Sequence, residues 1–427
     1  MNLLTLGKQF VAGFTANSAA LASSFAPDSI SYMWRKMIDA SVLTQDPTGH
    51  LVPFFGFREN YEDPVTESGC IPLAYECWQR YGDDRPLRKN LDAFSAYFDY
   101  YFSNPQNRRD PGLHPKCETA APDLSKGLLR GGMYAFDWYD DDTVVDLPSG
   151  QLPPRGARKL MWGTGVLLEN LEMFLDMSRY AGRVDLVEKY GELPGRIREE
   201  LNRKFYNPAT GSYGCQGNDA LALCAGVPSA EQRPAVVAAL ARDIEKRGGR
   251  FTTGTHGFPR LLNQLAENGC GQTAFELITR EGYPGLLNQL DAGYGTLMET
   301  WNTFRSPHGE IGGVLQSERA LMGGWFAEWL GGIRQDPRHP GFQNVILGPV
   351  FPPRLEFART EVPSPYGKIV SAWKREGGTI RWNITVPWNT GATVKLPVCK
   401  SITVNGQPQS PGGFHLSSGT WTVVYEE

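Results

Sequence analysis

The sequence predicts a mainly α-helical protein, a closed ring of helical hairpins followed by a small antiparallel β domain. Up to about residue 340, apolar residues recur at helical spacing in segments joined by Gly- and Pro-containing loops. These segments alternate in pairs without a fixed repeat period, which disfavours a solenoid. Beyond about residue 345, short apolar runs with a period of two lie between turn residues. We therefore expect a helical domain at 1–342 and a β domain at 343–427.

About eleven helices are expected in the first domain. A typical one covers 71–83 and stops near Gly82, because glycine readily takes the backbone conformation that ends a helix. Pro194 must interrupt or begin a helix, since proline lacks the amide hydrogen that a helix interior needs. The expected helices are 16–25, 29–40, 71–83, 85–102, 157–182, 184–207, 218–226, 229–248, 258–269, 271–282 and 317–333.

The C-terminal segments have the pattern of half-buried strands. In 378–388, four apolar residues alternate with polar ones and fall on one face of a strand: Ile380, Trp382, Ile384 and Val386. Further strands are expected at 391–398, 400–406 and 419–426. We expect this β domain to cover one side of the helical domain, and a separate carbohydrate-binding role is the alternative.

Composition limits the class of partner. The 427 residues carry a net charge of −4, with 21% charged and 41% hydrophobic residues, which is ordinary for a folded globular protein. No basic face is implied, so we expect no nucleic acid partner. The aromatic share of 11% fits a large core and a sugar-binding cleft equally well.

Cysteine usage and the N-terminal residues argue against a metal site and a membrane partner. The seven cysteines form no Cys-x-x-Cys pair, so no zinc site and no other metal or redox cofactor is expected. Cys70 and Cys77 share one expected helix, which indicates core packing. The stretch MNLLTLGKQF lacks the basic and apolar regions of a secretion signal, and no membrane span is visible. We therefore expect a cytoplasmic protein.

Several segments follow one another in a recognisable order. They are WQRYGD (78–83), FDWYDDD (136–142), NRKFYNPATGSYGCQGNDALAL (202–223), DIEKRGGRFTTGTHGFPRLLNQLAENG (243–269), YPGLLNQLDAGYGTLMETWN (283–302) and GGWFAEWLGGIRQDPRHPGFQNVILGP (323–349). From about residue 45 to the end, this order resembles the catalytic region of the inverting α-L-rhamnosidases, glycoside hydrolase family 78. The resemblance implies an (α/α)6 barrel, a six-hairpin toroid, followed by a small C-terminal antiparallel β-sandwich domain.

The resemblance also implies a general base. The family carries its base in a Thr-x-x-Trp-Glu-x-Trp-like stretch after a Tyr-Pro turn, which matches TLMETW at 296–301 and makes Glu299 the base. An inverting glycosidase needs this carboxylate and a carboxylic acid on opposite faces of the sugar, roughly 6.5–9.5 Å apart, so that a water fits between them. Trp301 shares the base's loop and is the best candidate for stacking on a sugar ring.

The family's acid is missing from its usual place. The corresponding stretch, KQFVAGFTANSAALA at 8–22, has Phe10 where the acid would stand and Asn17 where the last aspartate of the motif would stand. We therefore expect a relocated acid, Asp137 first and Glu67 second. Such an acid protonates a leaving group near neutral pH only if its pKa is raised, by burial or by a neighbouring anion. For Glu67, which precedes a helix start, capping of the helix is the alternative role.

Three further residues are predicted to bind substrate. Trp138 and Asp137 match a family Asp-Trp pair near the sugar, so Trp138 would line the pocket. His256, in TTGTHG, would bond a hydroxyl group or serve a structural role. Arg319 stands where the family has a histidine, and it would pair with Glu318 or Glu328 or hold a carboxylate on the substrate.

These residues leave three functions open. In the first, the protein cleaves a terminal α-L-rhamnosyl or similar sugar from a small-molecule glycoside or oligosaccharide by inversion. In the second, Glu299 is a lone base for an elimination, isomerisation or cyclisation of another small molecule, while Arg319 or His256 steadies the developing charge. In the third, the protein is a sugar-binding pseudoenzyme. The missing acid favours the second function, and the family resemblance favours the first.

Overall fold

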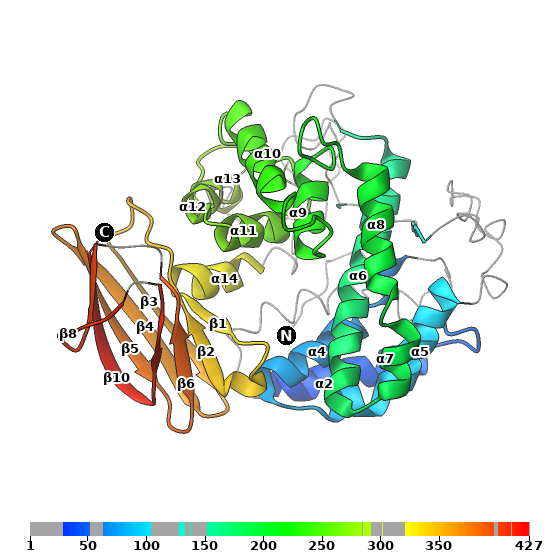
Figure 1. Cartoon of the computed structure of the whole chain (residues 1–427), viewed down its shortest axis with the longest axis horizontal. Helices are drawn as coiled ribbons and strands as arrows, with labels where there is room; N and C mark the ends of the chain where they lie inside the picture. The colour runs from blue at the N-terminus through cyan, green and yellow to red at the C-terminus, as the bar shows by residue number, and fades with distance from the viewer. Residues whose placement is uncertain are drawn as a thin grey trace. The chain divides into compact units, whose positions relative to one another are not determined.

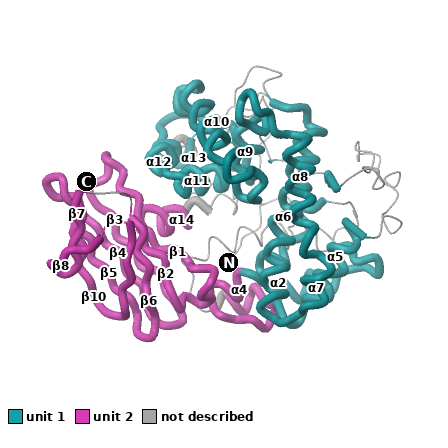
Figure 2. Tube along the Cα trace, viewed as in Figure 1, with its two compact units in different colours: residues 1–19, 36–75, 87–320 teal, residues 20–35, 76–86, 321–427 magenta. Residues whose placement is uncertain are grey.

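The structure is a computed structural model that describes residues 29–51, 63–103, 128–132, 137, 152–283, 285–291, 301, 321–396, 400–410 and 412–426. It divides into two compact units (Figure 2). The first unit consists of residues 1–19, 36–75 and 87–320, and its described part is helical. The second consists of residues 20–35, 76–86 and 321–427, and it contains all the strands β1 to β10 that the structure describes.

Most of the expected helices are present, with ends that differ by a few residues. The helices are α2 (Ser29–Leu43), α3 (Pro64–Glu67), α4 (Cys70–Tyr81), α5 (Arg85–Phe102), α6 (Arg155–Ala181), α7 (Val184–Tyr190), α8 (Leu193–Phe205), α9 (Gln216–Cys224), α10 (Arg233–Lys246), α11 (Gly257–Glu267), α12 (Gly271–Ile278), α13 (Leu286–Asp291) and α14 (Leu321–Trp325). As predicted, Pro194 separates two helices, and it stands in the first turn of α8. The expected helix 16–25 lies outside the described residues.

Two short helices, α3 and α13, were not predicted. The expected helix 317–333 is described from residue 321, and its second half is a π-helix at Phe326–Leu330. Cys70 and Cys77 are buried as predicted, and burial raises the pKa of each thiol to about 12. No helix among the described residues is long and apolar enough to cross a bilayer.

The long helix α6 organises the first unit. It packs against α3, α7, α8 and α9, while α9 packs on α10 and α11, and α11 on α12 (Figure 1). Two glycines let α6 approach its neighbours closely. A β-carbon at Gly163 would lie 2.5 Å from the carbonyl oxygen of Arg130, and one at Gly165 would lie 2.7 Å from a methyl carbon of Leu221 in α9. As a result, α6, α9 and α11 form a continuous packed series.

The second unit contains a β-sandwich. Its strands are β1 (Ile333–Gln335), β2 (Asn344–Leu347), β3 (Phe357–Ser364), β4 (Gly367–Glu376), β5 (Thr379–Val386), β6 (Gly391–Val394), β7 (Ser401–Val404), β8 (Gln407–Pro408), β9 (Phe414–Leu416) and β10 (Gly419–Glu426). One sheet has the order β1-β2-β6-β9 and the other β3-β4-β5-β10-β7-β8. All pairs are antiparallel except β2 and β6, which run parallel.

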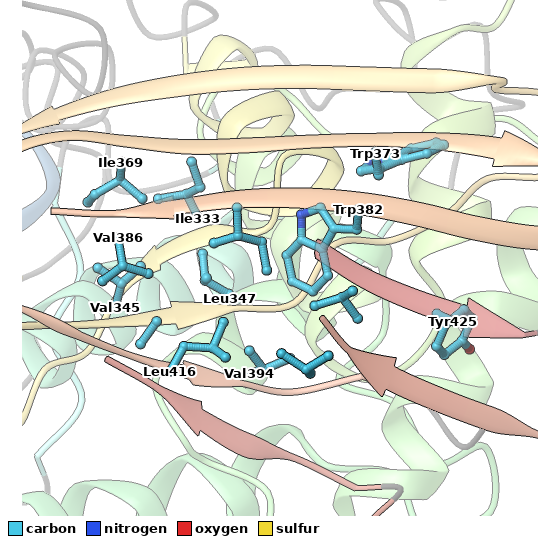
Figure 3. Close-up of a cluster of buried hydrophobic side chains, with 14 of the residues drawn as sticks. Ile333, Val345, Leu347, Ile369, Trp373, Trp382, Val386, Val394, Leu416 and Tyr425 are labelled. Carbon is cyan, nitrogen blue, oxygen red and sulfur yellow. The ribbon is translucent and has the colours of Figure 1, made fainter. Parts of the chain in front are cut away.

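Apolar side chains from both sheets form one core (Figure 3). The four alternating residues predicted for one face of a strand, from Ile380 to Val386 in β5, are all buried in it. The strands expected at 378–388, 391–398, 400–406 and 419–426 are confirmed, whereas β1 to β4, β8 and β9 were not predicted. Although β1 precedes residue 343, it belongs to the first sheet. The boundary at 342/343 remains a prediction.

Candidate active site

The carboxylate of Asp137 lies at the N-termini of α9 and α11 and is fully buried. Its Oδ1 accepts a hydrogen bond from the backbone N–H of Gly257 at 2.6 Å, and its Oδ2 accepts one from Gly254 at 2.7 Å. A β-carbon on Gly257 would lie 2.1 Å from Oδ2, and one on Gly217 would lie 2.9 Å from it. The first turns of both helices thus present bare backbone to this carboxylate, and the N-terminus of α11 favours its negative charge.

Trp301 is tied to the same turn. Its Nε1–H donates to the carbonyl oxygen of Thr253 at 3.0 Å, next to Gly254. Its ring packs on Phe251 and Phe258, with centroid distances of 4.6 and 5.2 Å, and only 1% of the residue is exposed. Stacking on a sugar needs an open ring face. The burial of Trp301 therefore does not support its predicted stacking role, and its contacts are those of a core residue.

His256 stands at the N-cap position of α11, and its ring lies 6.3 Å from the ring of the buried Trp162. The guanidinium of Arg260 lies over the same indole at 5.6 Å and pairs with Glu169 at 2.7 Å. Burial lowers the pKa of His256 to about 3, and the positive charge of Arg260 acts in the same direction. The imidazole is therefore neutral at neutral pH, so it can exchange hydrogen bonds but does not supply a positive charge.

Four buried polar atoms surround this turn and have no hydrogen-bond partner in the described part of the chain: Trp162 Nε1, Asn218 Oδ1, Thr253 Oγ1 and Thr255 Oγ1. Each residue is at most 1% exposed. Asn218 follows Gly217 and the two threonines flank Gly254, so these three residues belong to segments that contact Asp137, while the ring of Trp162 lies 6.3 Å from that of His256. Buried polar groups nearly always bond a protein group, a water or a ligand. This cluster is therefore suited to a ligand that is rich in hydroxyl groups.

Glu67 belongs to a separate set of contacts at the end of α3. Its Oε1 accepts hydrogen bonds from the hydroxyl groups of Tyr97, at 3.1 Å, and Tyr101. Its Oε2 accepts one from the backbone N–H of Asp63 at 3.0 Å and lies 2.9 Å from Nε2 of His50. The residue is only 2% exposed. Protein groups thus surround Glu67, as in a structural cluster. The N-cap of α3 is Asp63, whose side chain accepts a hydrogen bond from the backbone N–H of Val65, whereas the sequence suggests a capping role for Glu67.

Among the predicted site residues, the structure brings Asp137, His256 and Trp301 to the turn at 251–257. Glu299, Trp138 and Arg319 lie outside the described residues. Sequence reasoning missed the backbone donors of Gly254 and Gly257, although the Gly- and Thr-rich stretch TTGTHG marked their place. Within the described ranges, no group of three or more His, Cys, Asp or Glu side chains is arranged to hold a metal ion.

Residues 15–331 match the model of the bacterial alpha-L-rhamnosidase 6 hairpin glycosidase domain, and residues 332–410 match the bacterial alpha-L-rhamnosidase C-terminal domain. Among curated relatives, an alpha-L-rhamnosidase of Formosa agariphila is 29% identical over 192 residues, which are 44% of this chain and 20% of that protein. One of Streptomyces avermitilis is 27% identical over 336 residues, 77% of this chain and 29% of that protein. The chain thus spans less than a third of the length of these relatives.

Solved structures agree on the fold. The alpha-L-rhamnosidase from Dictyoglumus thermophilum superposes with a TM-score of 0.80 at 17% identity, covering 98% of this chain and 46% of that one. The Streptomyces avermitilis enzyme, solved in complex with L-rhamnose, gives 0.77 at 20% identity over 97% and 38% of the two chains. These likenesses and the two matched domains confirm the six-hairpin barrel with its C-terminal β domain. The chain belongs to the family of bacterial α-L-rhamnosidase six-hairpin glycosidase domains.

Proposed function

We propose that this chain hydrolyses a terminal α-L-rhamnosyl or similar deoxysugar linkage in a glycoside or oligosaccharide with inversion, and that Glu299 is the general base. Membership of the family and the names of the relatives support this chemistry. The ligand is a small carbohydrate, which agrees with the buried polar atoms around the 251–257 turn, because sugar hydroxyl groups both donate and accept hydrogen bonds.

The observation that carries the proposal is the hydrogen bond from Trp301 to Thr253. Trp301 follows the proposed base by two residues, and two residues of chain reach at most about 7 Å. Thr253 in turn adjoins Gly254, which donates to Asp137. In the proposal, Glu299 therefore acts near the turn where the buried polar atoms collect, and Trp301 positions the base's segment from within the core.

Asp137 and Glu67 have positioning roles in this proposal. A general acid must reach the leaving oxygen with a proton. Both oxygens of Asp137 already accept backbone hydrogen bonds, and the oxygens of Glu67 are engaged by two tyrosines, a histidine and a backbone N–H. We infer that Asp137 fixes the first turn of α11, that Glu67 fixes α3 against α5, and that a carboxylic acid elsewhere in the chain protonates the leaving oxygen. Trp138 would line the sugar pocket, and Arg319 would contact the substrate.

Elimination or isomerisation by a lone base is less well supported. That chemistry needs a group that steadies the developing negative charge, and His256, whose pKa is lowered to about 3, supplies no positive charge for this role. The relatives' names favour hydrolysis as well.

The test is the release of an aryl alcohol from aryl α-L-rhamnoside and from a small panel of other aryl glycosides. Wild type is compared with Glu299→Gln and with Glu188→Gln, an exposed glutamate of α7 that serves as the control. We expect the rhamnoside to be cleaved, its first product to have the inverted anomeric configuration by NMR, and Glu299→Gln to lose roughly 10²–10⁴-fold in kcat. A folded wild type that cleaves none of the glycosides, or a fully active Glu299→Gln, would refute the proposal.

A further inference from the structure

A cavity lies between the C-terminal ends of α8 and α10 and the first turn of α9. Its volume is about 940 Å³. Lys204 and Phe205 line it from α8, and Arg242 and Lys246 line it from α10. Asn207, Thr210 and residues 212–216 line it from the loop after α8 and the start of α9, and Pro153, Asp219 and Thr252 line it as well. This volume is within the range of small-molecule sites in proteins, roughly 300–1,000 Å³.

The cavity carries an excess of positive charge. Seven charged side chains line it, the cations Lys204, Arg242, Lys246 and Arg247 and the anions Asp219, Asp243 and Glu245. Arg247 and Asp243 form an ion pair with each other at 2.8 Å. Of the described residues, none provides a carboxylate partner for Lys204, Arg242 or Lys246, and Arg242 donates to the carbonyl oxygen of Thr210 at 3.3 Å.

The two remaining acids do not balance these cations. Asp219 is buried and accepts hydrogen bonds from the hydroxyl of Ser212 and the backbone N–H of Tyr213. Burial raises its pKa to about 7, so near neutral pH it carries only part of a negative charge. Glu245 is exposed. Within the described part of the chain, the cavity therefore has three cations without a carboxylate partner, Lys204, Arg242 and Lys246. Glu245 is the one fully charged carboxylate that remains to balance them. In a protein whose net charge is −4, such a surface attracts an anion.

The cavity shares two walls with the candidate active site. In α9, Gln216 lines the cavity while its neighbour Gly217 lies against Asp137. In the next loop, Thr252 lines the cavity while Gly254 donates to Asp137. The side chain of Gln216 ties these walls together, since it accepts from the N–H of Thr252 at 2.8 Å and donates to Asp243 at 2.8 Å. The cavity therefore adjoins the N-terminus of α9, whose Gly217 lies against Asp137.

We infer that this cavity is a separate binding site for a negatively charged sugar unit, one that bears a carboxylate or a sulfate group. Lys204, Arg242 and Lys246 bind the anionic group, while the hydroxyl and amide side chains of Ser212, Thr210 and Asn207 bond the sugar's hydroxyls. The inference goes beyond the proposed function, because a glycan can bind here whether or not a bond is cleaved at the 251–257 turn. The site would hold an acidic stretch of a polysaccharide beside the proposed centre of hydrolysis.

The experiment is a calorimetric titration of the full chain with three probes at low salt. A galacturonate trimer carries carboxylates, a carrageenan tetrasaccharide carries sulfates, and maltotriose is neutral. Wild type is compared with the triple variant Lys204→Gln, Arg242→Gln, Lys246→Gln. The matched control, Arg196→Gln, Arg354→Gln, Arg381→Gln, removes the same charge from exposed arginines that have no ion pair among the described residues. Thermal melting of both triple variants checks that they are folded.

We expect at least one anionic probe to bind more tightly than maltotriose, and its affinity to fall when salt is raised, because salt screens exposed charges. In the triple variant, binding of that probe weakens by roughly tenfold or more, while the control stays within about twofold. The probe that binds identifies carboxylate or sulfate as the source of the charge. Equal binding of all three probes, or unchanged binding in the triple variant, overturns the inference. Aryl rhamnoside turnover, followed in parallel, reports on the proposed function alone.

Discussion

Gly257 approaches Asp137 so closely that a β-carbon on the glycine would lie 2.1 Å from the carboxylate oxygen Oδ2. The same glycine donates its backbone N–H to the other oxygen, Oδ1, at 2.6 Å. The absence of a side chain at residue 257 is therefore what lets the carboxylate reach the first turn of α11. Because Gly254 of the same turn bonds Oδ2, one buried side chain fixes the loop that also receives Trp301.

Gly257→Ala should therefore destabilise the protein. The added methyl group must displace a buried carboxylate, and overpacking of this kind costs roughly 1–3 kcal/mol. Gly195→Ala in α8 is the control, since a β-carbon added there would have nothing within 4 Å and alanine is favoured over glycine in a helix by about 0.5–1 kcal/mol. Urea unfolding measures both. Equal free energies of unfolding for the two variants would contradict the close approach of Gly257 and Asp137.

Asp137→Asn distinguishes a positioning role from an acid. The amide has one acceptor oxygen, so one buried N–H of Gly254 or Gly257 loses its partner at a cost of about 1–3 kcal/mol. We expect the unfolding midpoint in urea to fall, and rhamnoside turnover to fall by a similar factor for good and poor leaving groups. A catalytic acid would behave differently. Its loss would lower stability in the same way, but it would slow mainly the glycosides whose leaving groups need a proton.

The sequence predicted the architecture better than the site. Apolar periodicity is local, so it located α4 to α12 and the strands β5, β6, β7 and β10 within a few residues. The strand β3 was missed because most of its residues remain at least partly exposed, so it lacks the apolar alternation of β5. Family resemblance supplied the arrangement of hairpins, which periodicity alone left as a ring of helices.

Site residues were harder to predict because their roles depend on distant partners. Asp137 was identified, but its partners are backbone N–H groups more than a hundred residues away, and these have no side-chain signature in a sequence. Trp301 looked like a stacking platform from its neighbours in sequence, whereas Phe251 and Phe258 bury it from another segment. For Glu67, the deciding partners Tyr97 and Tyr101 come from α5.

Glu67 offers a graded test of its structural role. We expect Glu67→Ala to cost roughly 3–5 kcal/mol, because it leaves His50, two tyrosine hydroxyls and the N–H of Asp63 without this partner inside the protein. Glu67→Gln should cost less, since its amide can donate to the tyrosine oxygens while its carbonyl still accepts from Asp63. The exposed Glu199→Ala serves as control. Urea unfolding measures the free energy of unfolding of each variant and so ranks their stabilities. A Glu67→Ala variant as stable as wild type would exclude the structural role.

Asp219 should make stability depend on pH. Burial raises its pKa from 3.8 to about 7, with a smaller increase from the nearby negative charge of Asp243. Between these values the folded state keeps a proton that the unfolded state has lost. The contribution of Asp219 to the free energy of unfolding is therefore largest below about pH 4. It decreases as pH rises towards 7 and does not change further above that pH. The total loss is at most about 4 kcal/mol, since one pKa unit corresponds to about 1.4 kcal/mol.

Asp219→Asn removes this titration but keeps an oxygen that can accept from the N–H of Tyr213. The variant should therefore gain stability relative to wild type as pH rises. The free energy of unfolding of the variant minus that of wild type should increase by a few kcal/mol, at most about 4, from pH 4.5 to pH 7.5. Urea unfolding at the two pH values measures the difference, and Asp291→Asn, at an exposed residue of α13, is the control. If the difference between Asp219→Asn and wild type is the same at both pH values, the side chain of Asp219 does not hold its proton up to neutral pH. The cavity would then contain a second full carboxylate, and its preference for anions would be weaker than inferred.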